Sequence, residues 1–174
     1  RAGHPLRAAD ARGILTHACH PRVPIPPPMN ALLEELERTW HQGIPITAAM
    51  QVGAVSYDGQ RLVIEAALAP NLNVHHTAFA GSLYSVCALA GWSMLWLKLR
   101  EHGRDGSILL AEAQIRYVKK VATALRGRCD FDGGSDLALA RALGSGKGVF
   151  ELDSVIDCEG APAVTFRGRY AVRF

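Results

Sequence analysis

The stretch TAFAGSLYSVCALAGWSMLWL, residues 77–97, contains no charged side chain and is long enough to cross a lipid bilayer as a helix. Segments with alternating apolar side chains lie on both sides of it, a pattern typical of half-buried strands. A helix that is apolar all round also suits the core of a soluble protein. Because the flanking strands need an apolar element to pack around, we predict a long buried helix over residues 78–101 and no membrane span.

The composition is that of one globular domain, with 174 residues, 49% hydrophobic and 20% charged. The net charge of +3 is dispersed and forms no basic stripe with stacking aromatics, which argues against a nucleic-acid partner. The four cysteines, Cys19, Cys87, Cys129 and Cys158, lack the paired spacing of metal sites and need no oxidising compartment. We therefore expect a cytoplasmic protein without a metal or prosthetic cofactor.

Residues 1–28 are rich in histidine, arginine and proline and end in Ile25-Pro26-Pro27-Pro28. This composition predicts an extended or disordered tail. The folded domain is then expected to cover residues 29–174.

The rest of the pattern predicts an α+β domain with about six strands, all able to pair antiparallel. Asn30 is expected to cap a short helix over 31–41. We expect strands over 46–56, 62–68, 108–119, 123–131, 149–157 and 163–173, and a loop over 133–148 that includes a helical turn at 136–143. In the last strand, apolar residues alternate with arginines, which predicts one buried and one solvent-facing side. Glu151, Asp153 and Asp157 of the preceding strand could pair with those arginines across the hairpin.

The motif NVHHTAFAGSLY, residues 73–84, followed by LAGW at 89–92, resembles the hotdog-fold thioesterases. It is most similar to the thioesterase domain that follows a GNAT acetyltransferase in some bacterial proteins. The segments IRYVKK at 115–120 and RGRY at 167–170 are similar to the third and last strands of acyl-CoA thioesterases. The resemblance implies a curved antiparallel sheet of about six strands wrapped around a central helix, and a homodimer.

The resemblance also implies a reaction, the hydrolysis of acyl-CoA or acyl-carrier-protein thioesters. Backbone N–H groups around Ala80 and Gly81 would bind the thioester carbonyl at the helix start, where such groups lack intrahelical partners. Gly81 would let the substrate approach the backbone closely, and Asn73 would hold the carbonyl or the attacking water. Many relatives carry a carboxylate about two turns further along the helix, but here that position is near Ala88, and residues 77–97 hold no Asp or Glu.

Another group must therefore activate water. His75 and His76 are candidate general bases near neutral pH, although either could simply cap the helix or bind a loop carbonyl. Ser82 and Ser85 could orient water or only fill space within the helix. Glu112 is a candidate replacement base.

Three further residues are candidate substrate contacts. Tyr84 could line the substrate site or belong to the core. Lys119 and Lys120 could meet the phosphates of the carrier or only end an exposed strand.

Two other functions remain open from the sequence. The missing helix carboxylate suits a module that binds acyl thioesters without cleaving them. A hotdog 3-hydroxyacyl dehydratase is the second alternative, although no carboxylate accompanies the histidines near the helix start.

Overall fold

The structure is a computed structural model that describes residues 29–174, so the predicted tail over residues 1–28 lies outside the described residues. The elements in chain order are α1 (Met29–Gly43), α2 (Pro45–Ala49), β1 (Val52–Tyr57), β2 (Arg61–Ala66), the 3₁₀ turn η1 (Ala69–Asn71), α3 (Ala80–Glu101), β3 (Ser107–Tyr117), β4 (Leu125–Asp130), α4 (Gly133–Ser145), β5 (Lys147–Cys158) and β6 (Ala161–Arg173).

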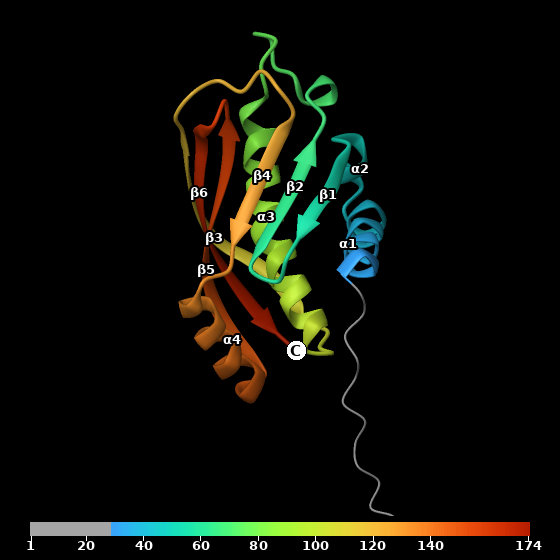
Figure 1. Cartoon of the computed structure of the whole chain (residues 1–174), viewed down its shortest axis with the longest axis vertical. Coiled ribbons are helices and arrows are strands. Elements are labelled where there is room, and N and C mark those ends of the chain that lie inside the picture. The colour runs from blue at the N-terminus through green and yellow to red at the C-terminus, as the bar shows by residue number, and fades with distance from the viewer. Residues whose placement is uncertain (1–28) are drawn as a thin grey trace, which may run out of the picture.

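The six strands form one antiparallel sheet in the order β1-β2-β4-β5-β6-β3. The sheet curves around α3, which runs along its inner face (Figure 1). This arrangement confirms the predicted α+β class, the six strands and the buried central helix. α3 is apolar enough to pass for a membrane span, but 61% of its most apolar window is buried inside the fold. Its composition is therefore explained by the sheet that surrounds it.

β6 shows how the side chains divide between the two faces of the sheet. Phe166 and Tyr170 are buried against α3, whereas Arg167 and Arg169 point outward and are exposed. This confirms the predicted alternation. Arg167 pairs with Asp153 of β5 through two hydrogen bonds of 2.8 Å, as expected for opposite charges across the hairpin.

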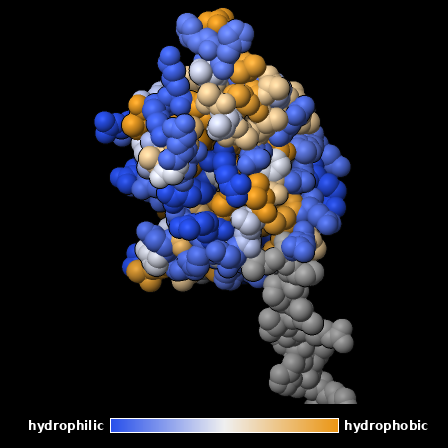
Figure 2. All heavy atoms as spheres, turned by 45° about the horizontal axis from the view of Figure 1, so that its top comes forward, coloured by the Kyte–Doolittle hydropathy of each residue, from blue (hydrophilic) through white to orange (hydrophobic). Residues whose placement is uncertain are grey.

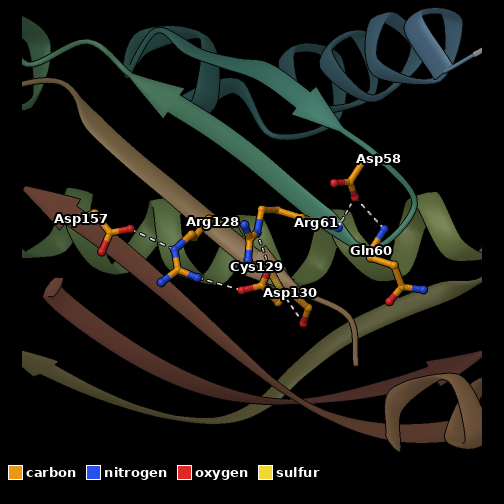
Figure 3. Close-up of polar contacts among 7 residues, drawn as sticks. All are labelled: Asp58, Gln60, Arg61, Arg128, Cys129, Asp130 and Asp157. Atoms are coloured by element: carbon orange, nitrogen blue, oxygen red, sulfur yellow. Dashed lines mark hydrogen bonds and ion pairs between the residues drawn. The ribbon is translucent and has the colours of Figure 1, made fainter. Parts of the chain in front are cut away.

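The outer face of β2 and β4 carries a chain of ion pairs (Figure 3). Arg128 donates to Asp157 at 2.9 Å and to Asp130 at 2.8 Å, and Asp130 also accepts from Arg61 at 2.5 Å. Asp157 therefore pairs with β4 and not with the arginines of β6, which corrects that part of the prediction. Hydrophilic side chains cover much of the face seen in Figure 2, as a solvated outer surface requires.

The prediction of a strand over residues 46–56 was wrong at its start. Residues 45–49 form α2, with Pro45 in its first turn, where its fixed φ favours a helix. Gln51 then takes a left-handed φ of 55°, and β1 begins at Val52. The alternation of Ile46 and Met50 is thus the spacing of one helical turn rather than of a strand.

The expected loop over residues 133–148 is instead mostly the helix α4. Asp132 caps it, because its carboxylate accepts from the N–H of Ser135 at 2.8 Å. Gly146 ends it in a left-handed conformation. Asn30 is not a cap either, since α1 already begins at Met29.

Candidate active site

The start of α3 presents backbone donors that find no partner within residues 29–174. Phe79 occupies the N-cap position in an extended conformation, and no side chain of the described residues caps the helix. The first intrahelical hydrogen bond runs from the N–H of Leu83 to the carbonyl of Phe79, at 3.0 Å. The N–H groups of residues 80–82 precede that bond, so they have no intrahelical acceptor. The helix dipole adds a partial positive charge at the same place.

Neighbouring segments fix this helix start from two sides. The N–H of Ala78 donates to the carbonyl of Val121 at 2.7 Å, and the N–H of Phe79 donates to the carbonyl of Asn71 at 2.7 Å. The Asn71 amide in turn donates to the carbonyls of Met50 at 2.9 Å and Ala67 at 2.7 Å. The chain before α3 is therefore tied both to the segment that follows β3 and to the start of β1.

Asn73 organises the loop that leads into α3. Its Oδ1 accepts from the N–H groups of His75 at 2.8 Å and Thr77 at 3.2 Å. Its Nδ2 donates to the Thr77 hydroxyl at 3.0 Å and to the Ala78 carbonyl at 3.2 Å. Both ends of the amide are therefore engaged in the loop, and Asn73 acts on the helix start through the loop that it holds together.

His75 and His76 lie at the tip of this loop, with exposed side chains. His76 has a left-handed φ of 56°, which completes the tight turn between Asn73 and Thr77. Its N–H donates to the Asn73 carbonyl at 3.1 Å. The loop that carries both histidines lies at the same end of the molecule as the start of α3 (Figure 1).

Two aromatic residues flank the helix start, and the sequence analysis did not select either of them. The Phe79 ring lies directly over Gly81, where a Cβ would overlap it. Gly81 therefore accommodates this ring, which differs from the expected open approach for a substrate. The Tyr117 hydroxyl donates to the carbonyl of Ala80 at 3.1 Å. Tyr117 is the aromatic residue of the 115–120 motif, so that motif was the feature of the sequence that could have identified Tyr117 as a site residue.

The remaining candidates on α3 have mainly structural contacts. Ser82 is buried at the helix start, and the Ser85 hydroxyl donates to the carbonyl of Gly81 at 2.9 Å. Tyr84 packs edge-on against Phe166, with ring centroids 5.3 Å apart. Ser85 and Tyr84 thus face different neighbours, with Ser85 on the wall of an apolar cavity and Tyr84 against Phe166.

The candidates on β3 divide between two places. Glu112 pairs in register with Arg169 on the outer face of the sheet, the side away from α3. Within one chain it is therefore not brought to the helix start. Lys119 and Lys120 follow Tyr117, and the next residue, Val121, binds Ala78 directly. The backbone of the two lysines therefore runs near the helix start, and the Lys119 ammonium pairs with Glu159 of the β5–β6 turn at 3.8 Å.

An apolar cavity of about 230 Å³ lies against the side of α3. α3 contributes Ser85, Ala88, Leu89 and Trp92, which recur at helical spacing along one face of the helix. The opposite wall comes from α2, the start of β1, β3 and Tyr170 of β6. These segments are far apart in the sequence, and α2 was predicted as part of a strand. No periodic pattern therefore indicated which residues line the cavity.

Among residues 29–174, no group of three His, Cys, Asp or Glu side chains is placed to hold a metal ion. The cysteines of this region, Cys87, Cys129 and Cys158, are buried free thiols. Burial raises the pKa of both Cys87 and Cys129 to about 12. These thiols therefore stay protonated at neutral pH and are poor nucleophiles.

A curved antiparallel sheet around one long helix, with unused backbone donors at the helix start, defines the hotdog class. Residues 33–174 match the family described as “Putative thioesterase (yiiD_Cterm)”, and the chain belongs to this family.

Solved structures agree with this assignment. A “putative thioesterase” from Shewanella oneidensis is 37% identical, with a TM-score of 0.77 over 84% of this chain and 100% of its own. A protein of unknown function from Chlorobaculum tepidum is 28% identical, with a TM-score of 0.77 over 83% and 96% of the two chains. A thioesterase from Haemophilus influenzae, 13% identical, shares the fold with a TM-score of 0.61 over 80% and 89%.

Proposed function

We propose that the protein hydrolyses acyl thioesters of coenzyme A or of acyl-carrier protein at the start of α3. The observation that carries this proposal is the set of uncapped N–H groups of residues 80–82 in a chain of the thioesterase family. Preorganised donors of this kind stabilise the negative charge that develops on a carbonyl oxygen during acyl transfer.

In the proposed reaction, water attacks the thioester carbonyl carbon, and the carbonyl oxygen takes the negative charge. The N–H groups of Ala80, Gly81 and Ser82 are the candidate donors to that oxygen. When the intermediate collapses, the C–S bond breaks and releases a carboxylic acid and a thiol. Tyr117 holds the first turn in place through the Ala80 carbonyl, and Asn73 holds the loop before it.

His76, or His75 beside it, is our candidate for the general base. It would accept the proton of the attacking water and return it to the sulfur of the leaving thiolate. Both imidazoles are exposed on the loop before the donors, and neutral imidazole is a competent base near pH 7. Lys119 and Lys120, whose backbone runs near the helix start, would meet the phosphates of the carrier.

A homodimer is part of the proposal. Within residues 29–174, β3 pairs on one side only, with β6. An unpaired strand edge is a template for pairing with another chain. Apolar side chains are exposed on β3, with Leu109 at 64% and Tyr117 at 49% of full exposure. Pairing through β3 would bury them and bring the partner close to Tyr117. The free thiols agree with a reducing compartment such as the cytoplasm.

Thiol release from a panel of acyl-CoA substrates tests the proposal, with wild type beside His76→Ala, His75→Ala and Asn73→Ala. Turnover by wild type that falls at least about 100-fold in one histidine variant supports a histidine base. If no substrate releases thiol although acyl-CoA binds, the hydrolase proposal fails. The absence of a carboxylate in residues 77–97 favours a binding module as the alternative in that case.

A further inference from the structure

The cavity beside α3 is nearly free of usable polar groups. Three hydroxyl groups reach its wall, and each donates to a main-chain carbonyl. Thr47 bonds to Ile44 at 2.8 Å, Ser85 to Gly81 at 2.9 Å, and Tyr170 to Ala88 at 2.9 Å. The Trp92 indole N–H is likewise engaged, since it donates to the carbonyl of Ile108 at 3.1 Å, and the other side chains, including Met50, Leu89 and Leu110, are apolar. A polar group entering the cavity would lose its hydrogen bonds to water without finding a donor in return.

The position of the cavity relates it to the candidate active site. Ser85, Ala88 and Trp92 line the cavity on the face of α3 that begins at Gly81, and the Phe79 ring lies on this face between the helix start and the cavity. Ser85 follows Ala80 by five residues, which is about 7 Å along the helix axis. An extended alkyl chain advances about 1.3 Å per carbon, since a C–C bond is about 1.5 Å. A chain whose carbonyl sits at the helix start therefore reaches the cavity after about six carbons.

The cavity volume limits how many further carbons of the alkyl chain can be bound. An apolar cavity of about 150 Å³ holds benzene, with six carbons, so a cavity of 230 Å³ scales to about nine. The α3 wall from Ser85 to Trp92 is about 10 Å long, which gives an elongated space along the helix. Ala88 lines this space at the position where the resemblance places a helix carboxylate. The small apolar side chain of Ala88 leaves this space empty and uncharged, whereas a carboxylate at the same position would fill part of it and place a negative charge there.

We propose that this cavity binds the distal part of an unbranched, unsubstituted acyl chain and sets a preference for about 10 to 14 carbons, with Ala88 as the residue that determines its length. This inference rests on the proposed thioesterase site, because the carbonyl is placed at the helix start. Chains shorter than about six carbons gain nothing from the cavity, and chains beyond about fourteen project from it.

Binding of S-alkyl pantetheine thioethers, measured by calorimetry on the full chain, tests this without any hydrolysis. These probes lack the carbonyl and carry the pantetheine arm common to both carriers. We expect the affinity to rise about fourfold per methylene between about six and fourteen carbons and then to level off. A terminal hydroxyl on the dodecyl probe is expected to weaken binding at least about fivefold. Affinity that does not depend on chain length, or an unaffected hydroxylated probe, overturns the inference.

Ala88→Leu is the matching variant, because it adds three carbons to the cavity wall. It should shorten the chain length at which affinity levels off by about three carbons, whereas Ala138→Leu, at a half-buried position on α4, should leave the profile unchanged. If Ala88→Leu does not fold, Met50→Ala on the opposite wall should instead lengthen the preferred chain. Identical profiles for the folded cavity variant and the Ala138→Leu control contradict the assignment.

The two proposals fail separately in these experiments. Length-dependent thioether binding without thiol release from any acyl-CoA keeps the cavity assignment and rejects the hydrolase. Thiol release that is equally fast for all chain lengths, with flat thioether binding, keeps the hydrolase and rejects the cavity assignment.

Discussion

For the residues near the start of α3, the sequence could predict the loop in which they lie but not the contacts that their side chains make. The motif at residues 73–84 predicted a loop that leads into the central helix, and Asn73, His75 and His76 do lie in that loop. The motif could not show that the Asn73 amide is spent inside that loop. Nor could it show that the Phe79 ring takes the space beside Gly81, because side-chain direction depends on packing.

Asn73→Ala removes the side chain that joins both ends of the loop. We expect it to lower the free energy of unfolding by about 1–3 kcal/mol, since several partly buried N–H and C=O groups of the loop lose their partner at once. Urea unfolding measures this change. Val74→Ala is the control, because Val74 is exposed on the same loop. Equal stability of the two variants would show that the Asn73 hydrogen bonds do not hold the loop.

Gly91 is explained by a close approach within the core. A Cβ at Gly91 would overlap the Tyr170 hydroxyl, which donates to the Ala88 carbonyl one turn earlier. Gly91→Ala should therefore cost about 1–3 kcal/mol through overpacking. Gly144→Ala, in a helix with open space around the new methyl group, should instead stabilise by up to about 1 kcal/mol. Thermal unfolding compares the stability of the two variants. A Gly91→Ala variant as stable as wild type would contradict the close contact between Gly91 and Tyr170.

At the level of elements, the sequence predicted the long strands and the central helix because both carry strong periodic patterns. It failed at α2 and at the ends of α4, whose middle part was predicted as a helical turn over residues 136–143. Ile46 and Met50 of the α2 region are four residues apart, a spacing that fits both one turn of a helix and the alternation of a strand. The pattern alone could therefore not distinguish a helix from a strand there. In α4, three glycines suggested a loop, but the Asp132 cap and the packing of Leu139 and Ala142 against the core stabilise a helix there.

The Asp132 cap makes α4 sensitive to acid. Hydrogen bonds from Ser135 hold the pKa of the Asp132 carboxyl below its usual value. A lowered pKa in the folded state adds stability above the unfolded pKa of about 3.9, and this contribution is lost as the pH falls through the folded value. Asp132→Ala should cost about 1 kcal/mol at pH 7. The free energy of unfolding of Asp132→Asn, whose cap is neutral, should approach that of wild type as the pH falls below about 4.

Unfolding free energies of wild type, Asp132→Ala and Asp132→Asn between pH 7 and pH 3 test this. A constant difference between wild type and Asp132→Asn across that range would exclude a titrating cap.

For the whole molecule, a sheet around a buried helix could be predicted because an all-apolar helix among alternating strands has few ways to be buried, whereas the hotdog class was implied by the resemblance of residues 73–84 to that family. The family match over residues 33–174 confirms the thioesterase part of the resemblance. The residues that line the cavity beside α3 could not be predicted, since they come from α2, α3, β1, β3 and β6 and the segments around them. Only the curvature of the sheet around α3 brings these segments together.

The proposed dimer is tested by the molar mass in solution. We expect light scattering to give twice the chain mass of 18.7 kDa. Leu109→Lys, at an exposed position on β3, should shift the population toward monomers, whereas Val149→Lys, at an exposed position on β5, should not. A wild-type monomer at micromolar concentration would contradict pairing through β3.

We propose that hydrolysis depends on the N–H groups at the start of α3, which would stabilise the charge on the thioester carbonyl. Ala80→Pro tests it most directly, because it deletes one N–H at the first helical position, where proline is well tolerated. The extended conformation of Phe79 already suits a following proline. We predict thiol release by wild type and a loss of about 100-fold or more in kcat for a folded Ala80→Pro variant. Unchanged kcat in that variant, or no thiol release by wild type, would contradict the account.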